Sequence, residues 1–167
     1  KPEMTIDPSK KYTATIETTE GTIVIDLDAA NAPTSVNNFV YLSRNGFYDG
    51  LLITRASKDF VIQTGSPNNT QQGGPGYTIQ SEAPPGPYAI GSVAWAKTGS
   101  EAAGTAGSQF FIGTGSGITS LPQDYGYIGK VSQGLDVAQK IMGFAPASGD
   151  GPPSPSVQMT KVTITES

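Results

Sequence analysis

The sequence predicts a mainly β fold, a closed barrel of about eight short strands with one helix early in the chain and one late. Several short segments alternate apolar and polar residues, which is the pattern of half-buried strands. Turn-forming residues are abundant, with 21 glycines and 13 prolines among 167 residues, and they separate these segments. Only two stretches carry the apolar spacing of a helix. Many short strands joined by turns favour a closed barrel.

The first elements are a hairpin and a helix. Apolar residues alternate over 12–16 and again over 23–27, and the turn sequence Thr18-Thr19-Glu20-Gly21 lies between them, which predicts a β-hairpin. Pro33 then opens a helical pattern that ends at Asn45-Gly46. Proline suits the first turn of a helix and glycine the position just past its end, so both boundaries have a physical basis.

The remaining elements are shorter. Six further strands are predicted, over residues 51–56, 60–64, 90–96, 110–113, 127–131 and 157–165. The second helix is predicted over 134–142. Four segments are predicted to be irregular, namely 65–88, 97–108, 114–126 and 145–156. A glycine- and proline-rich loop as long as 65–88 is often functional in a small domain.

Length and composition indicate a single domain. A chain of 167 residues can bury one core. Residues 1–11 are polar with two prolines and are predicted to form an N-terminal arm, and residues 12–167 form the domain. The chain starts at a lysine, so we expect an upstream piece, such as a signal or a tether, to have been removed.

Several functions are excluded by residue usage. The chain contains no histidine and no cysteine, so it has no Ser-His or Cys-His nucleophile pair and no thiolate metal site. The net charge is −4 and no basic run exceeds Lys10-Lys11, which disfavours nucleic acid as a partner. No stretch approaches the ~20 apolar residues of a membrane span. We expect neither a cofactor nor a metal.

One group of residues combines polar and aromatic side chains on predicted strands. Arg55 is followed by Phe60 and Gln63, and Gln109 and Phe111 lie on a later strand, two apart and therefore on one face. A surface arginine lying on the sheet would be the ordinary interpretation of Arg55. Its amide and aromatic neighbours instead indicate a pocket for an apolar ring beside a carbonyl, with no covalent chemistry.

The chain resembles the cyclophilins, the peptidyl-prolyl cis–trans isomerases, over about residues 12–164. The segments that carry the resemblance are Ala32–Phe39, Gly46–Gly50, the block Arg55…Phe60…Gln63, Gly73–Tyr77, Gly91–Ala96, Gly107–Ile112 and Gly129–Val131. The pattern is similar to the bacterial branch. The resemblance implies an eight-stranded antiparallel barrel capped by two helices, in agreement with the element count.

The resemblance also implies the site. The catalytic residues are expected to be Arg55 and Gln63. The substrate-binding residues are expected to be Phe60, Val61, Ala96, Lys97, Gln109, Phe111, Leu121 and Tyr125. Ser120 stands where a tryptophan important for cyclosporin binding is usual in the family, so cyclosporin-type cyclic peptides are expected to bind with reduced affinity.

The implied function is isomerisation of X–Pro peptide bonds, which assists protein folding. The partners are then proline-containing peptides and unfolded protein clients, and a monomer is expected. A non-catalytic module that binds proline peptides through the same pocket is the alternative. A bacterial extracytoplasmic location, secreted or lipid-anchored, is expected, with the cytoplasm as the alternative.

Overall fold

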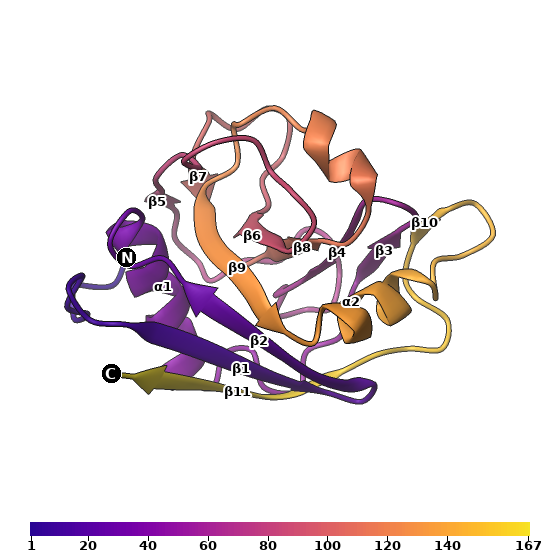
Figure 1. Ribbon diagram of the computed structural model, residues 1–167, viewed down its shortest axis with the longest axis horizontal. Coiled ribbons are helices and arrows are strands. Elements are labelled where there is room, and N and C mark those ends of the chain that lie inside the picture. The colour runs from indigo at the N-terminus through magenta and orange to yellow at the C-terminus, as the bar shows by residue number, and fades with distance from the viewer.

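The computed structural model describes residues 1–167 and contains eight strands of three or more residues, three strands of two residues, two α-helices and one 3-10 helix (Figure 1). The strands are β1 (Tyr12–Thr18), β2 (Gly21–Leu27), β3 (Arg55–Ser57), β4 (Val61–Thr64), β5 (Ile79–Gln80), β6 (Ser92–Trp95), β7 (Thr105–Ala106), β8 (Phe110–Gly113), β9 (Tyr127–Gln133), β10 (Asp150–Gly151) and β11 (Met159–Glu166). The helices are α1 (Pro33–Arg44), the 3-10 helix η1 (Ser116–Ser120) and α2 (Leu135–Met142).

Nine strands form one antiparallel sheet in the order β10-β3-β4-β8-β6-β9-β2-β1-β11, and β5 and β7 form a separate pair. The sheet is a strongly curled, open half-barrel, so the prediction of a closed eight-stranded barrel is wrong. The two ends of the sheet approach each other where residues 50–53 hydrogen-bond to residues 157–159, but Leu52 and Gln158 form only an isolated bridge. The segment before Arg55 is irregular, which is why no continuous ladder closes the barrel.

The predicted hairpin and helices are confirmed. β1 pairs with β2 along its whole length, with Thr18 opposite Gly21 at the turn. α1 begins at Pro33 and ends at Arg44, and Asn45 follows as its C-terminal cap. α2 lies one residue inside the predicted range. In Figure 1 the two helices lie on opposite sides of the curled sheet.

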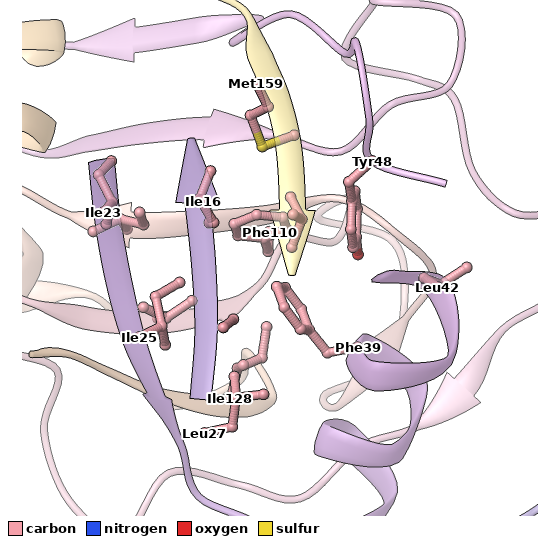
Figure 2. Packing of buried hydrophobic residues seen from close by; sticks show 14 of the residues in the cluster. Ile16, Ile23, Ile25, Leu27, Phe39, Leu42, Tyr48, Phe110, Ile128 and Met159 are labelled. Carbon is pink, nitrogen blue, oxygen red and sulfur yellow. The ribbon is translucent and has the colours of Figure 1, made fainter. Parts of the chain in front are cut away.

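The main core lies between α1 and the sheet. Phe39 of α1 is fully buried, and its ring lies 5.2 Å from that of Phe110 and 6.0 Å from that of Trp95, measured between centroids. Tyr48 packs at similar distances on both Phe39 and Phe110. Figure 2 shows Phe39 extending from the helix toward Phe110, with isoleucines of β1 and β2 beside them. These rings fix α1 against the sheet and therefore fix the strands that carry the site.

The central strands have two faces that belong to two different clusters. In β4, Ile62 belongs to the main core whereas Val61 belongs to a second cluster of five buried residues. In β8, Phe110 and Ile112 face the main core whereas Phe111 faces the second cluster. This alternation follows from the two-residue period of a strand. The second cluster lies under the candidate site.

Some predicted boundaries differ from the structure. The strand predicted over 51–56 is regular only from Arg55, and the two-residue strands β5, β7 and β10 lie inside segments that were predicted to be irregular. The segment 114–126 contains η1. Two-residue strands have no periodicity to detect, since the pattern needs four or more residues.

The N-terminal eleven residues are held against α1. The side-chain oxygen Oδ1 of Asn37 accepts hydrogen bonds from the backbone N–H groups of Thr5 (2.9 Å) and Ile6 (3.3 Å), and the Asn37 amide donates to the carbonyl of Glu3. The Ile6 side chain is buried in the main core.

Candidate functional site

The site is built on one transverse row of residues across four strands. In the sheet register, Arg55 of β3 lies opposite Gln63 of β4, Gln63 lies opposite Phe111 of β8, and Phe111 lies opposite Ala94 of β6. Directly opposed residues of antiparallel strands point to the same face. The register therefore places a guanidinium, an amide and an aromatic ring side by side.

Arg55 makes its shortest contacts with an acidic residue of β10. Its Nε donates to Oδ1 of Asp150 and its Nη2 donates to Oδ2, both at 2.8 Å. The hydrogen bonds from Arg55, opposed by partial burial, lower the pKa of the Asp150 carboxyl below its ordinary value. The same bonds raise the pKa of the Arg55 guanidinium, so Arg55 is a permanent cation and hydrogen-bond donor.

A chain of amides continues from Arg55 along the sheet. Nη1 of Arg55 lies 3.5 Å from Oε1 of Gln63, at the limit of a hydrogen bond. The Gln63 amide donates to Oε1 of Gln109 at 3.1 Å, and the Gln109 amide donates to the carbonyl of Gly73 at 2.8 Å. This chain links the arginine to the long glycine-rich loop.

A cavity of about 210 Å³ adjoins the guanidinium. Six of its nine lining residues are hydrophobic, which makes it suited to an apolar ring of modest size. The lining residues are Arg55, Phe60, Val61, Gln63, Ala96, Lys97, Phe111, Leu121 and Tyr125.

Aromatic contacts shape this cavity. The Phe111 and Tyr125 rings meet edge to face with centroids 5.7 Å apart, and Lys97 Nζ lies 4.9 Å from the centre of the Tyr125 ring. The Arg55 guanidinium carbon lies 5.7 Å from the centre of the Phe60 ring. Both cations thus cover aromatic faces at the mouth of the cavity.

Phe60 and Leu121 come from the two loops beside the sheet. Gly115, just before η1, approaches the backbone of Asp59 so closely that a Cβ on it would lie 2.1 Å from the Asp59 carbonyl carbon. Ser116 caps this contact, since its N–H donates to Oδ1 of Asp59 at 3.1 Å. Only glycine permits this approach, which brings η1 and Leu121 next to Phe60.

A second cavity, of about 670 Å³, adjoins the first and shares Gln63, Ala96 and Lys97 with it. Its walls are the glycine-rich segment 71–78 and the segment 105–109, and only three of its 18 lining residues are hydrophobic. Gln109, predicted as a substrate-binding residue, lines this larger cavity. The other nine predicted site residues line the smaller one.

Two residues at the site were missed by the sequence analysis. Tyr88 is buried under Phe111, and its hydroxyl both donates to the carbonyl of Tyr125 (2.5 Å) and accepts from the Tyr125 N–H (3.0 Å). Asp150 holds Arg55. Both lie in segments that were predicted to be irregular, and no spacing pattern in the sequence distinguishes them from ordinary loop residues.

Comparison with known proteins identifies the family to which the chain belongs. The family model described as "Cyclophilin type peptidyl-prolyl cis-trans isomerase/CLD" matches residues 13–164. The chain belongs to the cyclophilin-type peptidyl-prolyl cis–trans isomerases. It is therefore an isomerase with the mainly β cyclophilin fold and two helices.

Named relatives agree with this assignment. A peptidyl-prolyl cis-trans isomerase of Synechococcus elongatus is 44% identical over 99 residues, which cover 59% of this chain and 66% of that protein. One of Helicobacter pylori is 38% identical over 137 residues, covering 80% of this chain and 82% of that protein. The crystal structure of a cyclophilin-type isomerase of Cryptosporidium parvum superposes with a TM-score of 0.84 at 26% identity, covering 93% of this chain and 98% of that one. That cyclophilin was also crystallised in the presence of the dipeptide Ala-Pro.

No three His, Cys, Asp or Glu side chains gather closely enough to hold a metal ion. No helix has the length and apolar character needed to cross a bilayer.

Proposed function

We propose that the protein isomerises X–Pro bonds by holding the prolyl ring in the smaller cavity while Arg55 donates hydrogen bonds to the twisting amide. One observation carries the proposal: a guanidinium stands at the rim of a small, mostly apolar cavity. A cavity of this kind fits a pyrrolidine ring, and the arginine then lies beside the amide that rotates.

The chemistry needs no nucleophile. Rotation about a peptide bond faces a barrier of about 18–20 kcal/mol because resonance gives the C–N bond double-bond character. No bond breaks during the rotation. A donor that bonds to the prolyl carbonyl, or to the nitrogen lone pair as resonance is lost, favours the twisted amide over the planar one, and this difference raises the rate.

Arg55 cannot supply the whole effect. An acceleration of ~10⁶ corresponds to about 8 kcal/mol. One preorganised donor typically supplies roughly 2.7–4 kcal/mol. The rest is assigned to the walls of the cavity, which hold the ring and exclude water while the amide twists. Phe60, Val61, Phe111, Leu121 and Tyr125 form these walls.

Polar groups beside the cavity are proposed to hold the rest of the peptide. The amide of Ala96 donates to the carbonyl of Gln109, whereas the carbonyl of Ala96 and the amide of Lys97 bond to no other backbone group. These two groups point to an anchor for the peptide backbone. Gln63 orients Arg55 or the substrate, and Gln109 lines the adjoining cavity, where residues before the proline would lie.

The test is a protease-free assay of isomerisation by NMR exchange on a short X–Pro peptide, with wild-type protein and Arg55→Ala in parallel. Fast exchange with wild type and its loss in a folded Arg55→Ala variant are expected. Peptide resonances that shift without exchange would instead identify a non-catalytic module that binds proline peptides.

Finer assignments are also proposed. Relatives in Synechococcus and Helicobacter favour placing the chain in the bacterial branch, although a eukaryotic cyclophilin shares its fold. We also propose that the protein is a monomer and that its clients are unfolded proteins.

Cyclosporin-type peptides are proposed to bind weakly because Ser120, which immediately precedes Leu121, is small and exposed. A pull-down with immobilised cyclosporin tests this last point.

A bacterial extracytoplasmic location is proposed, with the cytoplasm as the alternative. The lack of cysteine is compatible with an oxidising compartment, since no thiol needs protection there. Fractionation of the producing cells followed by immunodetection separates the two locations.

A further inference from the structure

We propose that Asp150 is a positioning residue for Arg55, because its carboxylate holds the guanidinium in the orientation that presents the remaining N–H groups to the substrate. The inference rests on the proposed function, since it concerns the same arginine. It adds a residue that lies outside both cavities and on a different segment of the chain.

The geometry of the Arg55–Asp150 pair determines which N–H groups of the guanidinium remain free. A guanidinium carries five N–H donors in a rigid plane. Asp150 accepts one from Nε and one from Nη2, both at 2.8 Å, so it occupies one edge of the plane. Nη1 lies on the side of Gln63, which lines the small cavity. The edge formed by Nη1 and the second hydrogen of Nη2 is therefore left for a substrate oxygen or nitrogen.

No other contact fixes this orientation as tightly. The Arg55–Gln63 contact of 3.5 Å is weak, and the Phe60 ring lies 5.7 Å away. The arginine side chain is long and has many rotamers, so without a firm partner it would sample several orientations. A bidentate carboxylate supplies directional bonds that select one of them.

The segment that carries Asp150 is itself held in place. Asp150 and Gly151 form β10, which pairs with β3 so that Asp150 lies opposite Ser57. The Lys58 amide donates to the carbonyl of Gly149 at 2.8 Å, next to this pair. Farther along, the Ser154 amide donates to the carbonyl of Phe144, which closes the loop at its base. The carboxylate is thus anchored to the strand that carries Arg55.

The main test compares turnover with peptide binding. Asp150→Ala is expected to lower kcat about 10-fold, within the range that a small misplacement of a catalytic group produces, while the peptide Kd stays within twofold of wild type. Asp150→Asn keeps the shape of the side chain and one of its two oxygen acceptors, so kcat is expected to fall about threefold. Glu20→Gln removes another surface ion pair, to Lys140 at 3.2 Å, and serves as the matched control with unchanged turnover.

Two further measurements distinguish positioning from a merely structural role. In the Arg55→Ala background, Asp150→Ala is expected to have no additional effect on exchange, because its partner is gone. The chain has only two arginines, Arg44 and Arg55, so its arginine Nε–H NMR spectrum holds two signals. The Arg55 signal is expected to be downfield and protected from exchange in wild type and to lose both properties in Asp150→Ala, with Arg44 as the internal reference.

The outcomes separate this inference from the function on which it rests. If wild type shows no exchange, the proposed function fails. If wild type is active and Arg55→Ala is not, but Asp150→Ala keeps wild-type kcat, only the positioning role fails. An equal loss from Asp150→Ala with and without Arg55, or a loss confined to Kd, would also overturn it.

Discussion

The two adjoining cavities share three residues but differ in volume and in the hydrophobic share of their lining. The smaller, of about 210 Å³, has six hydrophobic residues among nine, and the larger, of about 670 Å³, has three among 18. The smaller is built on residues of β3, β4 and β8 together with apolar and aromatic side chains from the segments beside these strands. The larger is built on loops that expose backbone groups. This difference supports the proposal that the smaller cavity takes the prolyl ring and the larger one the residues before it.

The boundary between the cavities is the amide chain that starts at Arg55. Gln63 belongs to both cavities, and Gln109 belongs only to the larger. Changes on either side of this boundary should therefore have separable effects on turnover and on peptide preference.

Loss of the arginine should have the largest effect. Arg55→Ala removes the donor at the rim of the smaller cavity, so turnover is expected to fall on the order of 10²–10³-fold. NMR exchange on a short X–Pro peptide measures it, and the proton spectrum confirms folding. A fall of less than threefold in a folded variant would show that Arg55 is not the catalytic donor.

Loss of an apolar wall residue should have the next largest effect. Phe60→Ala opens the smaller cavity to water and removes part of an aromatic side chain whose full burial is worth about 1.5–3 kcal/mol. Because Phe60 is only partly buried, kcat/KM is expected to fall about 10-fold. Gln72→Ala, in the larger cavity, is the control. An equal fall in kcat/KM in both variants would contradict the proposed difference in role between the two cavities.

Tyr88 tests the support beneath the smaller cavity. Tyr88→Phe removes both hydrogen bonds to the Tyr125 backbone and is expected to lower the free energy of unfolding by about 1–2 kcal/mol. Urea titration measures this change at neutral pH. If Tyr88→Phe were as stable as wild type, this supporting role would be rejected.

The pH dependence of the free energy of unfolding gives a second measurement of the role of Tyr88. Burial raises the pKa of Tyr88 to about 12 from its ordinary 10. A raised pKa in the folded state means that the stabilisation is complete below pH 10 and is lost as the pH rises to 12. The stability difference between wild type and Tyr88→Phe should therefore shrink over this interval.

A charge in the larger cavity should have the smallest effect. Glu101 lines that cavity, and its carboxylate accepts a hydrogen bond from the Thr98 amide at 2.8 Å. Exposed charge pairs contribute roughly 0.2–1 kcal/mol, so Glu101→Lys should change the preference between acidic and basic residues before proline by about two- to fivefold. Competition between two labelled peptides measures the ratio. A uniform change for all peptides would contradict a role in selectivity.

The parts of the molecule that could be predicted from the sequence are those with local periodicity. Alternation over 12–27 predicted the hairpin, and Pro33 and Gly46 bracketed α1. Strand parity predicted Gln109 and Phe111 on one face, but Gln109 precedes β8 and lines the larger cavity, whereas Phe111 lies in β8 and lines the smaller one. The resemblance to cyclophilins added Leu121 and Tyr125, which lie on irregular segments.

The parts that could not be predicted depend on tertiary contacts. Asp150 lies in a two-residue strand within a proline-rich loop, and only the pairing of that strand with β3 brings it to Arg55. Tyr88 is buried because η1 and Phe111 cover it, and no neighbour in sequence indicates this. The closed barrel was expected from the number of strands and from the resemblance to the cyclophilins, whereas closure depends on the irregular residues 50–53.

The pairing of distant segments has a consequence for how this enzyme becomes active. Asp150 lies 95 residues after Arg55, and β1 is hydrogen-bonded on one side to β11, with Tyr12 opposite Glu166. Contacts between such distant residues form late, because a long loop must close first. During synthesis, residues 12–142 can emerge before either partner is present. This isomerase thus acquires its clamped arginine only after the C-terminal part of its own chain has been made.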